Sequence, residues 1–230
     1  MMSLHNHTTY SDGKLTPVEV VEAALAAGMG HVAITDHFAT QKVRSVRQDE
    51  LGQYVASIKE IASRYTGKIR VLAGVEIDAS PKRTDFETLP YEQLGKLDFV
   101  LLEYVQDQLW GGMDLWEILP YRRRLACHVG LAHNDIGKNF RDTNSASLVN
   151  LLESHEIFVE LCSSLRNSKF GKPYYRYAEQ FFRNAGGRVA VSIGTDAHHE
   201  PAEVCDVADA VSFVKEMGLE NSLVTQRYWK

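Results

Sequence analysis

The chain has 230 residues, of which 44% are hydrophobic and 24% are charged, and its formal net charge is −5. This composition is typical of a folded globular protein and excludes a disordered or fibrous chain. No apolar run approaches the roughly 20 residues that span a bilayer, and the N-terminus lacks the basic start and apolar core of a secretory signal. The acidic balance disfavours duplex nucleic acid but is compatible with a local phosphate pocket. We therefore expect a cytoplasmic protein that binds small phosphorylated molecules and no membrane.

Short apolar runs rich in β-branched residues alternate with amphipathic stretches, which indicates βα units around a parallel sheet. Seven strands are predicted, at residues 2–5, 31–36, 69–77, 99–105, 128–133, 157–161 and 188–194. The clearest helix follows the first strand, with Thr16 as N-cap and Glu19 completing a capping box. Pro17 occupies its first position and Gly28 ends it. Further helices are predicted at residues 51–65, 115–126, 146–155, 174–185 and 207–217.

These units fill the chain without a Ser- or Pro-rich linker, a repeat or a low-complexity tract. The pattern favours one domain, residues 1–230, folded as a closed or nearly closed α/β barrel. An open doubly wound sheet is the alternative. In both arrangements functional groups gather at the carboxyl ends of the strands. His31, His128 and His155 precede strands, so we expect them at the opposite face.

Imidazole and carboxylate side chains follow the ends of the predicted strands. The histidines are His5, His7, His37, His133 and His198, and the acidic residues are Asp12, Asp36, Glu76, Glu103, Asp135, Glu160 and Asp196. Packed carboxylates resist ionisation unless cations neutralise them, and imidazole beside carboxylate is the usual ligand set for zinc, manganese or iron. His5 and His7 lie two apart on an extended segment, so both rings face the same side and can share an ion. The pattern therefore predicts a cluster of divalent cations at the mouth of the sheet.

Five segments, HNHTTYSDG, ITDHF, GVEID, LAHND and GTDAH, occur in this order, each at the end of a predicted strand. Together they resemble the motifs of the polymerase and histidinol phosphatase superfamily, the PHP domains, over nearly the whole chain. The resemblance implies a distorted seven-stranded (β/α)7 barrel with its metal site at the C-terminal ends of the strands. It also implies two or three bound divalent metal ions, which would be zinc, manganese or iron.

The resemblance also implies a ligand set, carried over residue by residue. One ion would be held by His5, His7, Glu76 and Asp196, a second by Glu76 as a bridge and His133, and a third by Asp12, His37 and His198. The chain departs from the family after the fourth strand, where Val105 stands in the place of a histidine. Glu103, two residues earlier on the same side of the strand, is expected to supply an oxygen ligand instead. Otherwise the second ion is weakly bound or absent and the site is binuclear.

The segment VELCSSLRNSKFGKPYY resembles the part of histidinol phosphatases in which a glutamate ends a strand and an arginine follows in a polar loop. Those residues are here Glu160 and Arg166. Arg166 offers a planar fork suited to phosphate, and Lys169 and Lys172 lie nearby as point charges. The alternative interpretation is a solvated basic loop.

The resulting hypothesis is a metal-dependent phosphoric monoester hydrolase, a phosphatase, with Glu76, Asp196 and Arg166 as catalytic residues. Activated water would attack phosphorus while the cations and Arg166 neutralise the phosphoryl oxygens. The leading candidate substrate is L-histidinol phosphate. The alternatives are a nucleotide or oligonucleotide phosphoesterase and a non-catalytic metal-binding PHP module. Asp36 or Asp135 could protonate the leaving group, but both also suit structural roles, one orienting a ligand and the other capping a loop.

Overall fold

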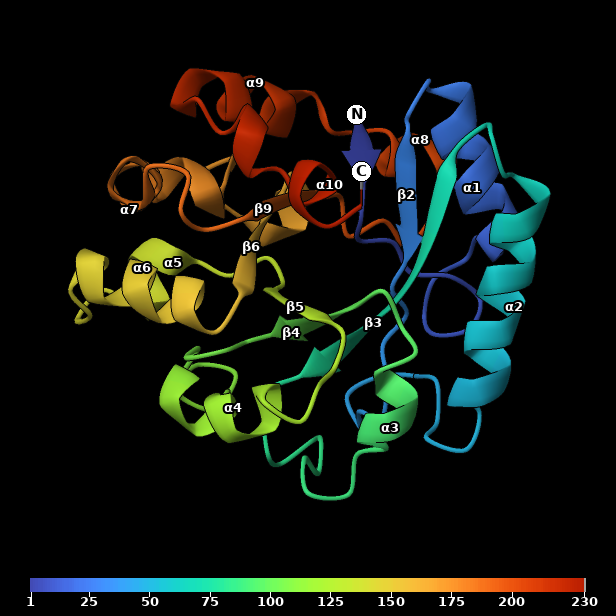
Figure 1. Cartoon of the computed structure of the whole chain (residues 1–230), viewed down its shortest axis with the longest axis horizontal. Helices are drawn as coiled ribbons and strands as arrows, with labels where there is room; N and C mark the ends of the chain where they lie inside the picture. The colour runs from blue at the N-terminus through green and yellow to red at the C-terminus, as the bar shows by residue number, and fades with distance from the viewer. Residues whose placement is uncertain (230) are drawn as a thin grey trace.

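The computed structural model describes residues 1–229, and its centre is a sheet of seven parallel strands. The strand order is β1 (Met2–Ser3), β2 (His31–Ile34), β3 (Arg70–Asp78), β4 (Phe99–Glu103), β5 (His128–Leu131), β6 (Ile157–Cys162) and β9 (Val191–Gly194). The outer strands β1 and β9 meet, because the Leu4 amide donates a hydrogen bond to the Ile193 carbonyl at 2.8 Å. The sheet therefore curls into a nearly closed barrel (Figure 1), which confirms the predicted α/β barrel over an open doubly wound sheet.

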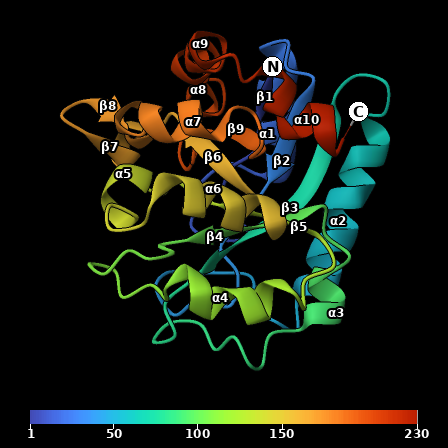
Figure 2. The same ribbon diagram turned by 60° about the vertical axis from the view of Figure 1, so that its left-hand side comes forward.

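Helices cover the outside of the barrel, as Figure 1 and Figure 2 show from two directions. The longer ones are α1 (Pro17–Ala26), α2 (Leu51–Arg64), α4 (Leu115–Arg122), α6 (Ser145–Ser154), α7 (Glu179–Ala185) and α9 (Ala208–Met217). The single turns are α3 (Tyr91–Leu94), α5 (Ile136–Asn139), α8 (Pro201–Val204) and α10 (Val224–Arg227), with 3-10 turns at η1 (Leu165–Asn167), η2 (Tyr174–Tyr177) and η3 (Glu220–Ser222). A short antiparallel hairpin, β7 (Ser168–Lys169) and β8 (Lys172–Pro173), packs against η1 and η2 and is labelled in Figure 2.

Helix α1 begins with the capping box that its sequence predicts. The Thr16 hydroxyl accepts a hydrogen bond from the Glu19 amide at 3.3 Å, and the Glu19 carboxylate accepts one from the Thr16 amide at 2.7 Å. These two contacts satisfy amides that have no partner inside the helix. Gly28 follows the last turn with a φ of +70°, a left-handed conformation that favours glycine. The helix packs Val20, Val21 and Ala24 against the barrel.

Several predicted elements run longer than the observed ones. Helix α7 begins at Glu179 instead of residue 174, because residues Tyr174–Tyr177 form a 3-10 turn in which the Tyr175 hydroxyl bonds the Asp209 carboxylate. Strand β1 pairs with β2 only over Met2–Ser3, and farther along the chain the Asn6 amide bonds the Thr35 hydroxyl at 2.9 Å instead of a backbone carbonyl. The side chains that follow β1 are thereby directed to the mouth of the barrel.

The amino-terminal end of the barrel is closed by aromatic side chains. Gly130 leaves room for Phe158, because a Cβ atom there would lie 2.1 Å from the Phe158 ring. The C-terminal segment adds two contacts at this end. Tyr228 stacks on His128 with ring centroids 4.0 Å apart, and His31 Nε2 lies 3.2 Å from the Trp229 carbonyl. His31 and His128 therefore lie at the face opposite the strand ends, as predicted, and His155 follows α6 as its C-cap.

The buried hydrophobic side chains of the barrel and its helices form one continuous cluster. This cluster agrees with the expectation of a single domain, which stays a prediction. Among residues 1–229, no helix has both the length and the apolar character needed to cross a membrane.

Candidate metal centre

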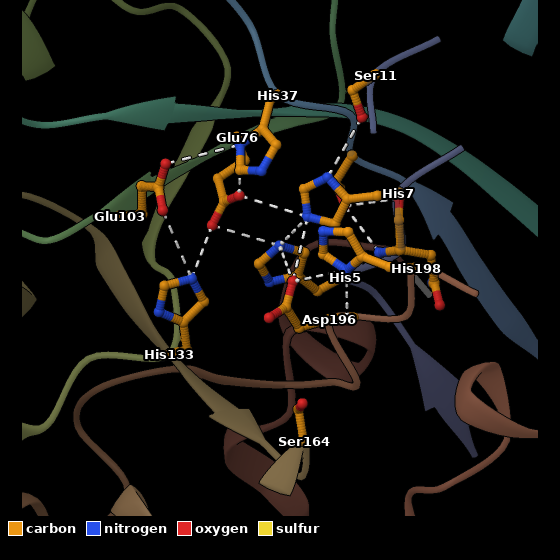
Figure 3. A network of polar contacts seen from close by, with 12 residues as sticks. His5, His7, Ser11, His37, Glu76, Glu103, His133, Ser164, Asp196 and His198 are labelled. Atoms are coloured by element: carbon orange, nitrogen blue, oxygen red, sulfur yellow. Dashed lines mark hydrogen bonds and ion pairs between the residues drawn. The ribbon is translucent and has the colours of Figure 1, made fainter. Parts of the chain in front are cut away.

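The nine side chains predicted as metal ligands converge at the carboxyl ends of the strands, and Figure 3 labels all of them except Asp12. They come from the segments that follow β1, β2, β5 and β9 or from the last residues of β3 and β4. The ligand atoms of eight of them form three groups, each within 4.8 Å: His7, Asp12, His37 and His198; His5, His7 and Asp196; and His37, Glu76 and Glu103. The ninth, His133, adjoins the third group through Glu76 Oε1 at 3.0 Å. Groups of this kind could hold metal ions, and the sharing of His7 and His37 makes them one continuous site.

The paired histidines after β1 face the same way, as their spacing predicts. His5 Nε2 and His7 Nε2 lie 3.0 Å apart, and both rings are buried. Asp196 Oδ1 approaches the same point, 3.2 Å from His7 Nε2 and 3.7 Å from His5 Nε2. Two ring nitrogens and a carboxylate oxygen therefore surround one small volume, which suits a divalent cation.

Glu76 lies at the centre of the site and is fully buried. Its Oε1 atom is 3.0 Å from His133 Nε2 and 3.4 Å from His5 Nε2. Its Oε2 atom is 3.0 Å from His37 Nδ1 and 3.4 Å from His7 Nε2. The two oxygens thus face different histidines, which is the geometry expected of the predicted bridge between two ions.

Asp12 joins the outer histidines at the open side of the site. Its Oδ1 atom is 3.5 Å from His198 Nε2, 3.7 Å from His37 Nε2 and 3.8 Å from His7 Nδ1. The sequence-based grouping of Asp12 with His37 and His198 therefore agrees with their positions. The role of each as a ligand stays a prediction.

Glu103, and not Val105, faces the site. In the β3–β4 ladder Glu103 lies opposite Asp78, and its oxygens lie 3.6 Å from His37 Nδ1 and 3.9 Å from His133 Nε2. Val105 is fully buried in the hydrophobic core. The expectation that Glu103 takes the histidine's place is consistent with this geometry. Sequence reasoning missed its partner, Lys42, whose Nζ lies 2.7 Å from both Glu103 oxygens.

Glu160 contacts the ligands but belongs to none of the three groups. Its Oε1 atom lies 2.9 Å from His5 Nδ1, and its Oε2 atom accepts a hydrogen bond from the His133 amide at 2.6 Å. A carboxylate next to Nδ1 favours the proton on that nitrogen and leaves the His5 Nε2 lone pair for a metal ion.

Asp36 and Asp135 each accept hydrogen bonds that hold the local backbone in place. Asp36 is fully buried and accepts hydrogen bonds from the amide and hydroxyl groups of both Thr8 and Ser11, at 2.7–3.0 Å. It therefore fixes the loop between the paired histidines and Asp12. Asp135 caps α5 by accepting a hydrogen bond from the Lys138 amide at 3.1 Å. These contacts favour the structural interpretation of both acids over protonation of a leaving group.

Burial brings the charges of the centre close enough to shift one another's pKa. Burial by itself lowers the pKa of His5, but Glu160 and Glu76 outweigh it and hold the pKa well above its ordinary value. His133 is also buried, yet its contact with Glu76 raises its pKa to about 9. For His7 burial dominates and lowers the pKa to about 3. Protonated imidazoles therefore balance part of the negative charge in the metal-free protein.

The residues present fit divalent metal ions. Three buried atoms in the centre, Asp12 Oδ1, His37 Nδ1 and Glu76 Oε2, make no well-formed hydrogen bond among the described residues, although Glu76 Oε2 and His37 Nδ1 lie 3.0 Å apart. An unsatisfied buried polar group costs about 1–3 kcal/mol, and more when it is charged. Cations held between these atoms would satisfy all three, and the mixture of nitrogen and oxygen donors suits zinc, manganese or iron.

A cavity of about 450 Å³ adjoins the histidine cluster at His133. Its lining includes Tyr104, Trp110, Asp135, Arg166, Lys169 and Tyr174. Arg166 is half exposed and lies 3.4 Å from Glu203, whose carboxylate accepts hydrogen bonds from the His198 and His199 amides. The structure thus brings Arg166 and Lys169 to the cavity, whereas Lys172, on β8, is not part of its lining.

Asn167, next to Arg166, was not singled out from the sequence. Its side-chain nitrogen Nδ2 donates a hydrogen bond to Asp196 Oδ2 at 2.8 Å, while Asp196 Oδ1 faces the paired histidines. This contact orients the carboxylate toward the site. It also links the loop that carries Arg166 to a predicted ligand.

The sequence model of the PHP domain family matches residues 3–220, and the chain belongs to this family. The chain is 35% identical over 226 residues to the uncharacterized protein MJ1295 of Methanocaldococcus jannaschii, with 96% of this chain and 90% of that protein covered. It is 24% identical over 229 residues to a probable histidinol-phosphatase of Deinococcus radiodurans, with 88% of each covered. By contrast, the chain spans only 17% of the DNA polymerase/3'-5' exonuclease PolX of Bacillus subtilis, to which it is 34% identical over 101 residues.

Solved structures share the fold. The histidinol phosphate phosphatase of Lactococcus lactis, complexed with zinc, L-histidinol and phosphate, matches with a TM-score of 0.66 at 16% identity, over 95% of this chain and 94% of that one. A structure from work on the metal-dependent tyrosine phosphatases YwqE of Bacillus subtilis and CpsB of Streptococcus pneumoniae matches with a TM-score of 0.59 at 19% identity, over 96% and 89%. The enzyme class expected from the sequence is therefore the class of these neighbours.

Proposed function

We propose that this chain is a metal-dependent phosphatase that hydrolyses a small phosphate monoester. The observation that carries the proposal is the convergence of histidines and carboxylates around Glu76, with three buried ligand atoms that make no well-formed hydrogen bond among the described residues, beside a cavity lined by Arg166 and Lys169. When bound, divalent ions in such a site supply charge neutralisation and a nucleophile near neutral pH. The protein side chains must hold these ions and bind the phosphoryl group.

The protein residues have distinct tasks in this proposal. Glu76 and Asp196 are the carboxylates that face the paired histidines, and they would hold the ions in register with the cavity. Arg166 would leave Glu203, a half-exposed partner at 3.4 Å, and place its planar fork on two phosphoryl oxygens. Lys169 adds a point charge at the cavity wall. Lys172 lies farther along the same hairpin and would act only at longer range.

L-histidinol phosphate is the leading candidate substrate. A cavity of about 450 Å³ lies within the range of roughly 300–1,000 Å³ usual for small-molecule sites. Its wall carries Asp107 and Asp135, whose carboxylates suit a cationic leaving group, and the rings of Tyr104 and Tyr174 suit a planar one. The likeness to histidinol phosphatases in sequence and fold supports the same candidate.

A nucleotide or oligonucleotide is the second candidate, on one specific observation. The Trp110 ring stacks on Tyr104 with centroids 5.0 Å apart, and Trp110 is 47% exposed at the cavity. Exposed aromatic rings of this kind bind nucleobases by stacking, worth about 1–3 kcal/mol per base. The net charge of −5 disfavours a long strand, so a mononucleotide or short end is the form this candidate takes.

Turnover assays test these alternatives directly. The purified protein, loaded with Mn²⁺ or Zn²⁺, is given L-histidinol phosphate, nucleoside monophosphates, short single strands and phosphotyrosine, and released phosphate is measured. We expect the highest kcat/KM for L-histidinol phosphate and loss of nearly all activity in His7→Ala and Glu76→Ala. A preference for nucleotides would select the second candidate. No turnover with any metal would favour a non-catalytic metal-binding module.

A further inference from the structure

One cation is already fixed inside the acidic side of the metal centre. Lys42 Nζ lies 2.7 Å from Oε1 and 2.7 Å from Oε2 of Glu103, so the ammonium group bridges the whole carboxylate. The Tyr104 hydroxyl lies 3.2 Å from the same nitrogen. The Lys42 side chain is 19% exposed and that of Glu103 is 1% exposed. This is therefore a largely buried, charge-assisted contact and not a surface ion pair.

The position of this ion pair decides what Glu103 can bind. Glu103 lies between His37 and His133 (Figure 3), the same two histidines that face the oxygens of Glu76. A divalent ion held by Glu76, Glu103 and His133 would need a Glu103 oxygen that the ammonium group already occupies. Lys42 and such an ion therefore compete for one carboxylate.

We propose that the Lys42 ammonium takes the place of one divalent ion on the Glu103 side of the site, so that the chain binds two ions instead of three. The inference rests on the metal-binding part of the proposed function and deepens it. Among residues 1–229, no lysine forms a hydrogen bond or ion pair with the remaining ligand groups, around the paired histidines and around Asp12, so these groups stay free to bind ions.

Charge balance supports this assignment. Among the described residues, five carboxylates contact the histidines of the centre: Asp12, Glu76, Glu103, Glu160 and Asp196. Two divalent cations and one ammonium group neutralise five negative charges when the imidazoles are neutral. A third divalent ion would add excess positive charge next to a fixed ammonium in a buried site, where repulsion between like charges is screened least.

Counting bound ions in matched variants tests the inference. The metal-free protein is dialysed to equilibrium against Mn²⁺, and bound manganese is measured per chain. We expect two ions in the wild type and three in Lys42→Met, because the variant exposes the Glu103 oxygens without a charge beside them. Lys42→Arg keeps the charge and is expected to bind two. Lys138→Met, which removes a lysine that lines the cavity beside His133, is also expected to bind two.

Two further variants keep the test decisive. If Lys42→Met does not fold without metal, as judged by circular dichroism, Lys42→Gln replaces it with the same expectation of three ions. The double variant Lys42→Met with Glu103→Gln lacks both charges and is expected to bind two. Three ions in the wild type, or two in every Lys42 variant, would overturn the inference. Because the readout is ion number, a protein without phosphatase activity but with this pattern would contradict only the proposed reaction.

Discussion

Glu160 ties together two histidines that reach the metal centre from different strands. Its Oε1 atom lies 2.9 Å from His5 Nδ1 and its Oε2 atom 2.6 Å from the His133 amide nitrogen. His133 has a positive φ of +29°, a conformation unusual for a residue other than glycine, and the amide contact helps to hold it. One buried carboxylate therefore fixes both the ring orientation of His5 and the backbone that presents His133.

Replacing Glu160 by Gln is expected to weaken metal binding without removing a ligand. Glutamine has one acceptor oxygen in place of two, so it satisfies only one of the His5 and His133 donors. Loss of a carboxylate that orients a ligand histidine typically lowers metal affinity about 10–100-fold. Equilibrium dialysis against Mn²⁺ measures the change, with Glu92→Gln on the exposed side of α3 as control. Unchanged affinity would mean that Glu160 does not orient His5.

Gly194, at the end of β9, leaves room for the side chains of Glu160 and His5. A Cβ atom there would lie 1.9 Å from Glu160 Oε1 and 2.6 Å from the Cβ of His5, so even alanine forces both side chains to move. We expect Gly194→Ala to lower the free energy of unfolding by about 1–3 kcal/mol, as overpacking does, and to reduce manganese uptake. Gly52→Ala, in α2 where a Cβ meets open space, serves as control for denaturant unfolding. Equal stabilities would contradict the close packing at Gly194.

The sequence predicted the positions of those site residues that directly follow or end a strand of the parallel sheet. The carboxyl ends of parallel strands meet at one edge, so residues such as His5, Glu76 and Asp196 could be placed together before their distances were known. Lys42 and Asn167 were missed for a physical reason. Lys42 lies in a loop and Asn167 in the short η1 turn, neither of which has periodic patterning, and their contacts with Glu103 and Asp196 depend on the local path of the backbone.

Metal binding is expected to strengthen as the pH rises from 6.5 to 9. In the metal-free protein burial is outweighed by Glu76, so the pKa of His133 is about 9, and that of His5 is well above its ordinary value. Both rings therefore carry protons near neutral pH, and an ion must displace them. Manganese affinity measured at pH 6.5, 7.5 and 8.5 tests the trend. Proton release, followed by calorimetry in buffers with different ionisation heats, should accompany binding, and its absence would contradict the raised pKa values.

The same shift predicts the opposite trend for stability without metal. A histidine whose pKa is raised in the folded state contributes stability that is complete below its unfolded pKa, about 6.5, and is lost as the pH rises through the folded value. For His133 that window extends to about pH 9. The Tm of the chelator-treated protein should therefore fall between pH 6.5 and 9. His133→Asn should flatten this dependence, and an equally steep fall in the variant would assign it to other groups.

Arg166→Ala is expected to weaken substrate binding more than it slows the chemical step. Arg166 lines the cavity but contacts none of the predicted ligands, so its loss should leave the number of bound ions unchanged. A charge-assisted hydrogen bond contributes roughly 1.5–3 kcal/mol, and half exposure reduces this to about a tenfold rise in KM. Steady-state kinetics with L-histidinol phosphate measure kcat and KM separately. Lys172→Ala, outside the cavity lining, should change KM less, and equal effects of both variants would favour a diffuse basic loop over a phosphate-binding arginine.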